Sequence, residues 1–322
     1  MSVNRFTGTV PCKSASKAFS LPGRAIRWSV AKAKLIWQSK LVLLLVLPFA
    51  GAGVVLQAHW WATQVAEVTV WALGLSLLLG IVVLWLRAAT PAAAFTGAVI
   101  TASLMFSTSI FPYQPWRTAL LPVLAVSVLA YVATRLGRAK KELLGTAEKR
   151  HGRSAAQVAA NLGVAALVSD GFVQSWLSDT HWFTRAGIVP MPLFAVGLAA
   201  LAEAAADTVS SEIGQVLGGR PRMITTLRVV DPGIDGAISV AGTLAGVAAA
   251  AIVALAGTLA LSGGYGMFWV SGAGAIFGLL FDSLLGATLE RRGWLNNDAV
   301  NFLSTAGAAG FAVGVLAVLP HS

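Results

Sequence analysis

The sequence predicts an all-α protein, a polytopic bundle of about nine transmembrane helices, with seven to nine spans compatible with the pattern. Of its 322 residues, 57% are hydrophobic and only 11% are charged, whereas a soluble domain carries roughly 25% charged residues. The apolar residues fall in blocks of about 20, the length that a helix needs to cross the hydrocarbon core. The basic residues collect between alternate blocks. A soluble globular fold is therefore excluded.

Each expected span is an apolar block bounded by charged residues or by Gly and Pro. The nine blocks are 41–58, 68–86, 91–111, 118–134, 154–177, 186–206, 237–261, 267–289 and 299–319.

The distribution of positive charge predicts the orientation of these spans. If the N-terminus is cytoplasmic, 21 of the 23 Lys and Arg residues lie in inside segments, and only Arg117 and Arg185 lie outside. We therefore expect an integral protein of a bacterial plasma membrane. A plastid membrane is the alternative, because a start rich in Ser, Lys and Arg also describes a transit peptide. The inside segments are 1–40, 87–90, 135–153, 207–236 and 290–298.

Three regions are expected along the chain. Residues 1–40 form a basic arm with eight Lys and Arg and no acidic residue, which suits an anionic membrane surface better than a nucleic acid. Residues 41–86 form two extra N-terminal spans, and residues 87–319 form a membrane domain with a cytoplasmic polar loop at 207–236. The single cysteine and four scattered histidines argue against disulfide and zinc chemistry.

The densest polarity begins where the sixth block ends. Glu203, Asp207 and Ser211 are spaced i, i+4, i+8 and share one helical face, with Glu212 next in the chain. Neighbouring carboxylates repel one another unless a cation lies between them, and hard oxygen ligands favour Mg²⁺ shared with a substrate phosphate. We predict Asp207 and Glu212 as Mg²⁺ ligands. The alternative is a polar helix end that is simply solvated.

The loop that follows carries groups suited to phosphate. Arg220, Arg222 and Arg228 flank Thr225, so guanidinium groups and a hydroxyl are available for phosphate oxygens. Arginines at a membrane surface are equally explained by the positive-inside rule. Gly233 and Gly236 then lead into the seventh block, and a glycine loop that opens a helix offers free N–H groups to an anion.

Two further acids, Asp170 and Asp282, lie inside apolar blocks, where an ionisable residue is costly and is expected to face the bundle interior. Asn297 and Asp298 follow Asp282 in the stretch RRGWLNNDAVN and suggest a second oxygen-rich lip, although Asn-rich turns also cap helices.

The fifth block begins with polar residues. Arg153 lies just before Gln157 and Asn161, and this basic stretch is interpreted mainly as a topological signal. The two amides inside an apolar helix require interhelical hydrogen bonds or a ligand.

From about residue 87 to 318, the chain resembles the multi-pass membrane family of formerly unknown function that includes the plant plastid phytyl-phosphate kinase and a vertebrate transmembrane protein. The resemblance implies phosphoryl transfer from a nucleoside triphosphate, CTP or ATP, to an isoprenoid monophosphate. It places Asp207, Ser211, Glu212, Thr225, Gly236, Asn297 and Asp298 on shared polar motifs. The matching stretches are AATPAAAFTGAVI, RSAAQVAANLG, ADTVSSEIG, PRMITT, GIDGAISVAGTLAG and GWLNNDAVN.

The preferred hypothesis is a Mg²⁺-dependent kinase of phytyl or polyprenyl phosphate, whose partners are a membrane isoprenoid and a nucleotide but no nucleic acid. The acceptor is already an anionic nucleophile, so the chemistry needs positioning and charge neutralisation more than a base. The alternatives are a secondary transporter with a relay of Asp170, Glu203 and Asp282, and a lipid-binding protein without turnover. The predicted catalytic residues are Asp207, Ser211, Glu212, Arg222 and Thr225, and the predicted binding residues are Arg220, Arg228, Gly233, Gly236, Asp282, Asn297 and Asp298.

Overall fold

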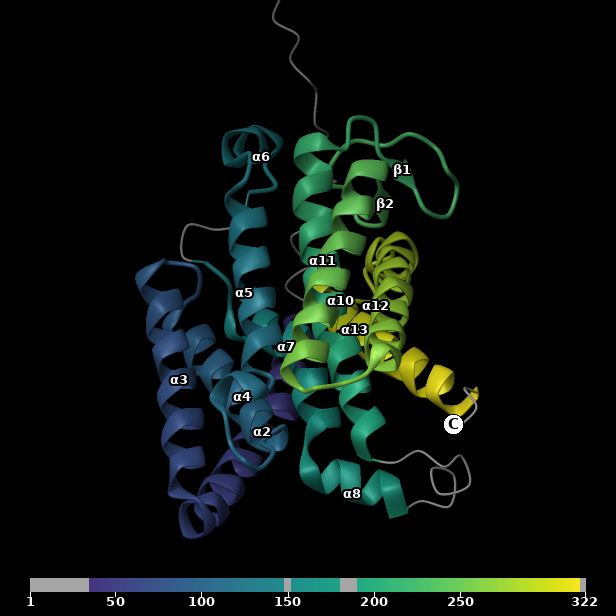
Figure 1. Cartoon of the computed structure of the whole chain (residues 1–322). Coiled ribbons are helices and arrows are strands. Elements are labelled where there is room, and N and C mark those ends of the chain that lie inside the picture. The colour runs from purple at the N-terminus through teal and green to yellow at the C-terminus, as the bar shows by residue number, and fades with distance from the viewer. Residues whose placement is uncertain (1–34, 148–151, 180–189, 319–322) are drawn as a thin grey trace, which may run out of the picture.

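Helices make up nearly all of the regular structure in the computed structural model, which describes residues 35–147, 152–179 and 190–318 (Figure 1). This confirms the predicted all-α, multi-pass membrane fold. The predicted basic arm before residue 35, and Arg185, lie outside the described residues. The helices are α2 (Ile36–Gln64), α3 (Ala66–Trp85), α4 (Pro91–Ser107), η1 (Pro115–Arg117), α5 (Leu120–Arg135), α6 (Arg138–Leu144), α7 (Ala155–Ser169), α8 (Gly171–Asp179), α10 (Pro190–Leu217), α11 (Val240–Ala260), α12 (Tyr265–Leu285), the π-helical turn η2 (Gly286–Glu290) and α13 (Asn297–Val318).

The predicted number of nine spans is too high. Within the described residues, six helices are long and apolar enough to cross a membrane, or seven if the bent pair α5 and α6 counts as one span. Every predicted block contains a helix, but α4 has 17 residues and α7 has 15, and 15 residues extend only about 22 Å.

Asp170 explains why α7 is short. Its backbone leaves the helical region, with ψ at 136°. Its Oδ1 accepts a hydrogen bond from the N–H of Phe172 at 2.9 Å, so the side chain caps the start of α8. Figure 1 shows α8 turned across the end of the bundle. The predicted fifth span is therefore two helices with a polar break.

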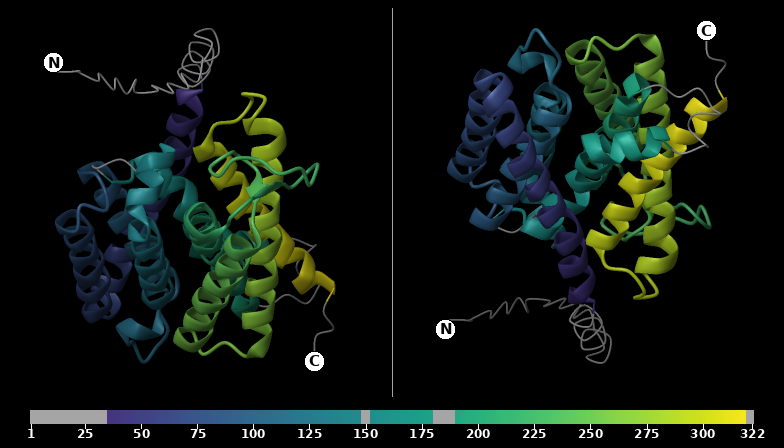
Figure 2. Two further views of the ribbon diagram at one scale, coloured as in Figure 1. Left: turned by 90° about the horizontal axis from the view of Figure 1, so that it is seen from above. Right: turned by 90° about the horizontal axis from the view of Figure 1, so that it is seen from below.

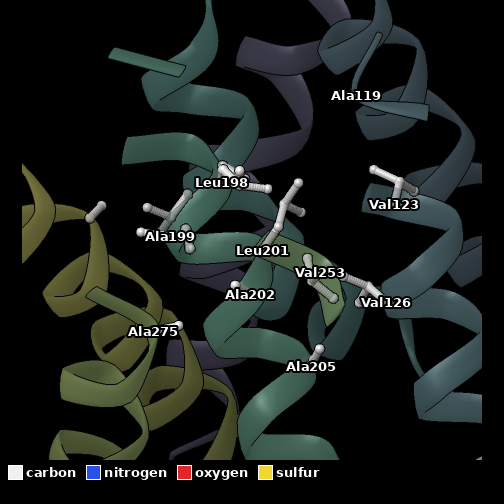
Figure 3. Packing of buried hydrophobic residues seen from close by; sticks show 14 of the residues in the cluster. Ala119, Val123, Val126, Leu198, Ala199, Leu201, Ala202, Ala205, Val253 and Ala275 are labelled. Carbon is white, nitrogen blue, oxygen red and sulfur yellow. The ribbon is translucent and has the colours of Figure 1, made fainter. Parts of the chain in front are cut away.

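Helix α10 is the centre of the bundle. It packs against α5, α7, α11, α12 and α13, and 78% of its most apolar window is buried, compared with 22% for α2 and for α3. Its core face is rich in alanine, including Ala199, Ala202 and Ala205, and belongs to the same buried cluster as Val123 of α5 and Val253 of α11 (Figure 3). Small side chains allow helix backbones to approach closely, which is how helices associate within lipid.

The segments predicted to lie inside meet at one end of the bundle, which we call the polar end. Backbone hydrogen bonds join Arg153 to residues 88 and 90, each at 3.0 Å, and Lys140 Nζ donates to the Val216 carbonyl at 2.6 Å. At the opposite end, Arg117 Nη2 donates to Ser262 Oγ at 2.6 Å. The grouping agrees with the predicted topology. That the polar end faces the cytoplasm stays a prediction.

The first span belongs to this bundle. It begins at Ile36, before the predicted residue 41, and packs against α4 and α7, crossing the molecule obliquely (Figure 2). At the polar end Ser39 Oγ donates to Asp298 Oδ2 at 2.6 Å, and Gln38 Nε2 donates to the Trp294 carbonyl at 2.8 Å. The start of α2 is therefore fixed to the turn before α13.

The predicted polar loop is shorter than expected, because α10 continues to Leu217 instead of ending near 206. Asp207, Ser211 and Glu212 consequently lie on a helix. The connection that remains contains two short antiparallel strands, β1 (Arg222–Met223) and β2 (Ala237–Ile238), in which Arg222 is opposite Ile238.

Candidate functional site

A polar cleft of about 270 Å³ opens at the polar end. Asp207 comes from α10, Asp282 from α12 and Asn297 from α13, while Arg153 and the loop that contains Gly236 complete the wall. Ser211, Glu212 and Gly233 also line it. The remaining lining residues are Gln157, Asn161, Thr208, Ser210, Gly214, Gln215, Pro221, Pro232, Ile234, Asp235, Ala237, Ser239, Ser283, Gly286, Glu290 and Asn301.

The carboxyl groups of Asp207 and Asp282 form the floor of this cleft, and the carboxyl group of Glu203 is buried next to them. Asp207 interacts electrostatically with both Glu203 and Asp282. Glu203 is only 1% exposed, and both Glu203 Oε1 and Asp282 Oδ2 are buried atoms without a hydrogen-bond partner. Buried carboxylates are costly unless protons or cations balance them. The floor therefore needs protons or cations to balance it.

The protein alone does not complete a metal cage there. In the described parts of the chain, no three His, Cys, Asp or Glu side chains are arranged to hold a metal ion. Mg²⁺ typically uses one or two carboxylates together with substrate phosphates and water. Asp207 and Asp282, with the orphaned Oδ2 of Asp282, fit that mode.

Arg153 lines the cleft, a role that the topological interpretation of its charge does not predict. Its backbone is held by the pairing with residues 88 and 90. Its Nη2 lies 3.5 Å from Thr208 Oγ1, and its charge acts on Asp207. In the sequence, the feature that could have indicated this role is the position of Arg153 just before two polar amide side chains, Gln157 and Asn161. One of them, Gln157, completes a capping box with Ser154, and the other, Asn161, accepts from Asn301 Nδ2 at 2.9 Å.

Glu212 reaches the cleft wall, but its carboxylate is engaged elsewhere. One oxygen pairs with Lys141 Nζ, and the other accepts from Thr134 Oγ1 at 3.2 Å. Five residues correspond to a rotation of about 140° around a helix, so Glu212 faces α5 and α6 while Asp207 faces α12. The geometry does not favour the predicted role of Glu212 as a metal ligand.

The predicted arginine clamp does not converge on the cleft. Arg220, Arg222, Arg228 and Thr225 are exposed on the loop around β1, and none of them lines the cleft. Arg222 Nη1 donates to the Leu227 carbonyl at 2.9 Å within the same loop. Their predicted contacts with phosphate stay predictions.

The glycine loop lines the cleft, and both of its glycines are required by the backbone conformation. Gly233 and Gly236 have φ values of 85° and 77°, which L-residues rarely adopt. A Cβ at Gly236 would collide with the backbone of Ala287 in η2, and one at Gly233 would lie 2.5 Å from Thr146 Cγ2. The loop is therefore wedged between the end of α12 and the residues after α6.

The side chains of the turn formed by Asn296, Asn297 and Asp298 have different roles. Asn297 lines the cleft, whereas Asp298 accepts the hydrogen bond from Ser39. Asn296 Oδ1 accepts from the Ala299 N–H at 2.9 Å and so caps α13. The structure therefore brings Asn297, but not the Asp298 carboxylate, to the cleft.

An apolar cavity of about 460 Å³ lies beside the cleft, between α3, α4, α5, α7 and α10. Leu79, Val83, Val126 and Leu162 are among its lining residues. Arg87, Arg135 and Arg138 line its polar end, and Arg153 and Asn161 line both this cavity and the polar cleft.

Residues 74–309 match the integral membrane protein family DUF92. The chain belongs to this family. It is 46% identical over 119 residues to the uncharacterized membrane protein MJ0933 of Methanocaldococcus jannaschii, covering 37% of this chain and 49% of that protein. It is 33% identical over 215 residues to membrane protein sll0875 of Synechocystis, covering 62% of this chain and 74% of that protein.

A plant relative is more distant. The chain is 32% identical over 197 residues to the chloroplastic protein VTE6 of Arabidopsis thaliana, covering 59% of this chain and 57% of that protein. The alignments thus span about half the length of the MJ0933 and VTE6 proteins. No solved structure matches this chain.

Proposed function

We propose that this protein is a Mg²⁺-dependent kinase that transfers a phosphoryl group from CTP or ATP to a phytyl or polyprenyl monophosphate. The observation that carries the proposal is a polar, acid-floored cleft that shares Arg153 with an apolar cavity among the membrane helices. A donor in water and an acceptor in lipid require these two environments side by side. The resemblance to the family that includes the plant plastid phytyl-phosphate kinase supports this chemistry, and it rests on the same relationship as the similarity to VTE6.

The reaction makes limited demands on the side chains. An oxygen of the acceptor monophosphate attacks the γ-phosphorus of the donor, the bond from that phosphorus to the β,γ-bridging oxygen breaks, and a nucleoside diphosphate leaves. No proton must be removed from a phosphate that is already ionised, so a general base is not required. Arg153 balances phosphate charge, and the backbone of the loop around Gly236 is placed to approach the donor.

The floor acids suit a divalent cation, which when bound supplies positive charge for the transferring phosphoryl group. Asp207 and Asp282 would hold it, since Glu212 is paired with Lys141. Glu203 lies beneath them, 1% exposed, where an ionised carboxylate needs a proton or a cation to balance it.

The test is turnover by the purified full chain in lipid nanodiscs, with geranylgeranyl or phytyl monophosphate, CTP or ATP, and Mg²⁺. Asp207→Asn removes a charge from the cleft floor and should lower the rate by about 100-fold or more. The control is Asp231→Asn, because Asp231 is exposed in the same connection and does not line the cleft. An unchanged rate in Asp207→Asn, or no diphosphate product from the wild-type protein, would contradict the proposal.

One observation also suits a transporter, namely the burial of Glu203 and Asp282 with orphaned oxygens. The third member of the predicted relay has another role, because Asp170 caps α8. Cation-coupled uptake into liposomes that is independent of nucleotide and lost in Asp282→Asn would favour transport. Lipid binding with neither uptake nor turnover would favour the non-catalytic alternative.

A further inference from the structure

We propose that the apolar cavity holds the isoprenoid chain of the acceptor, and that Arg153 holds its phosphate at the junction with the polar cleft. This inference rests on the proposed function and specifies where its substrate binds.

The walls of the cavity match a single flexible hydrocarbon chain. Helices α3, α4 and α5 contribute aliphatic side chains such as Leu79, Val83 and Val126, and small residues such as Ala98 and Ala130 keep the space open. The volume of about 460 Å³ lies within the roughly 300–1,000 Å³ of ligand pockets. Two acyl chains of a phospholipid would need more room than one isoprenoid chain.

The charges at the polar end of the cavity match a phosphate. Arg87, Arg135, Arg138 and Arg153 line this end together with one acid, Glu142, and that acid already pairs with Arg138 at 3.0 Å. The excess of positive charge favours an anionic headgroup over an alcohol or a neutral lipid.

An arginine bridges the ends of α3 and α5 beside the cavity. Arg135 Nη2 donates to the Leu86 carbonyl at 2.9 Å, and its guanidinium lies 4.8 Å from the centre of the Tyr131 ring. These contacts place a cation at the level where the apolar wall ends. A headgroup anchored there leaves its chain among the helices.

Arg153 determines the direction of the headgroup. It lines both the cavity and the cleft, and its backbone is fixed by hydrogen bonds of 3.0 Å to Ala88 and Thr90. A phosphate bound to its guanidinium has its chain on one side and the acidic floor on the other. This is the orientation that an in-line transfer from a nucleotide in the cleft requires.

Binding of geranylgeranyl monophosphate to the full chain in detergent micelles, without nucleotide and without Mg²⁺, tests the site independently of turnover. Ser127→Leu adds volume to the cavity wall. Ser127 Oγ donates to the Val123 carbonyl of its own helix at 2.8 Å, so no interhelical hydrogen bond is lost. The variant should bind about tenfold more weakly. Val128→Leu is the matched control, because Val128 is 58% exposed on the same helix and should bind as the wild type does.

Ala98→Leu fills the same cavity from α4 and tests the site separately if Ser127→Leu does not fold. Arg153→Gln should abolish the preference for geranylgeranyl monophosphate over geranylgeraniol, while Arg292→Gln, an exposed arginine at the same end, should retain it. Wild-type binding in both Ser127→Leu and Ala98→Leu, or an unchanged preference in Arg153→Gln, would overturn the inference. Equal affinity for phosphatidic acid would overturn the assignment to a single chain.

The two proposals fail separately. If the wild-type protein binds the monophosphate, Ser127→Leu weakens binding and no diphosphate forms, the lipid site stands and the kinase proposal falls. If the wild-type protein makes diphosphate at a rate that Ser127→Leu and Ala98→Leu do not change, the kinase proposal stands and this site falls.

Discussion

The buried ion pair between Lys141 and Glu212 can be tested directly. The sequence predicts Glu212 as a Mg²⁺ ligand, whereas the structure gives it a role in stability. Lys141 is 1% exposed, and its Nζ donates to the Ala133 and Thr134 carbonyls at 2.7 and 3.2 Å as well as to Glu212. Lys141 therefore provides hydrogen-bond donors for the last carbonyl groups of α5 and links α6 to α10. If Glu212 has this structural role, replacing either partner should reduce stability.

The expected magnitude follows from the burial of the pair. Lys141→Met leaves the Glu212 carboxylate, 13% exposed, with Thr134 as its other hydrogen-bond donor, and breaking a buried pair in this way costs about 3–5 kcal/mol. Adding Glu212→Leu removes the stranded charge, so the double variant should lose only about 1–2 kcal/mol. The double variant should therefore be about 2–3 kcal/mol more stable than Lys141→Met alone, so the effects of the two substitutions should not add.

Unfolding of the purified variants in mixed micelles, followed by tryptophan fluorescence, measures this coupling. Losses that simply add in the double variant would show that the two side chains do not interact. Glu212→Gln should also leave the Mg²⁺ concentration for half-maximal turnover unchanged. A tenfold rise in that concentration with unaltered stability would restore the original interpretation of Glu212 as a metal ligand.

Two further predictions concern the frame around the cleft. Gly236→Ala should destabilise the protein by about 1–3 kcal/mol, because Gly236 combines a φ of 77° with a close approach to Ala287. The melting temperature of the variant measures this loss. The control is Gly266→Ala, because a Cβ at Gly266 would meet open space. Ser39→Ala removes the hydrogen bond to Asp298 and should speed amide exchange at the start of α13. The same exchange rate in Ser39→Ala and in the wild type would contradict a fixing role for α2.

Much of the fold could be predicted, because lipid imposes strong rules on sequence. The structure has a helix in every predicted apolar block, and the positive charges correctly indicated which segments meet at the polar end. The errors arose where polar side chains act locally. The cap made by Asp170 depends on backbone conformation, which hydropathy does not report, and a span broken at Asp170 has the same composition as a continuous one.

The site was predicted less completely, because a helical face is a relation within one element whereas a cleft is formed between several. The spacing of Glu203 and Asp207 correctly placed them on one face. The partner of Glu212 depends on how α6 folds back at Gly137, where φ is 61°. That partner is Lys141, and the sequence does not distinguish a buried lysine from the other basic residues of its loop. Arg153 was similarly hidden among the many basic residues of the same loop.

A lipid kinase must bring a soluble donor and a membrane acceptor to one point without opening the bundle to water. On the proposed function, that point is Arg153, and the structure explains why a side chain there can be positioned accurately. Its main chain pairs with residues 88–90 in a short parallel bridge, so α4 and α7 begin from one junction. Because the main-chain bonds do not depend on the side chain, Arg153→Gln should preserve this junction and remove only the cation. Loss of phosphate selectivity with unchanged melting temperature would therefore assign the effect to the guanidinium group itself.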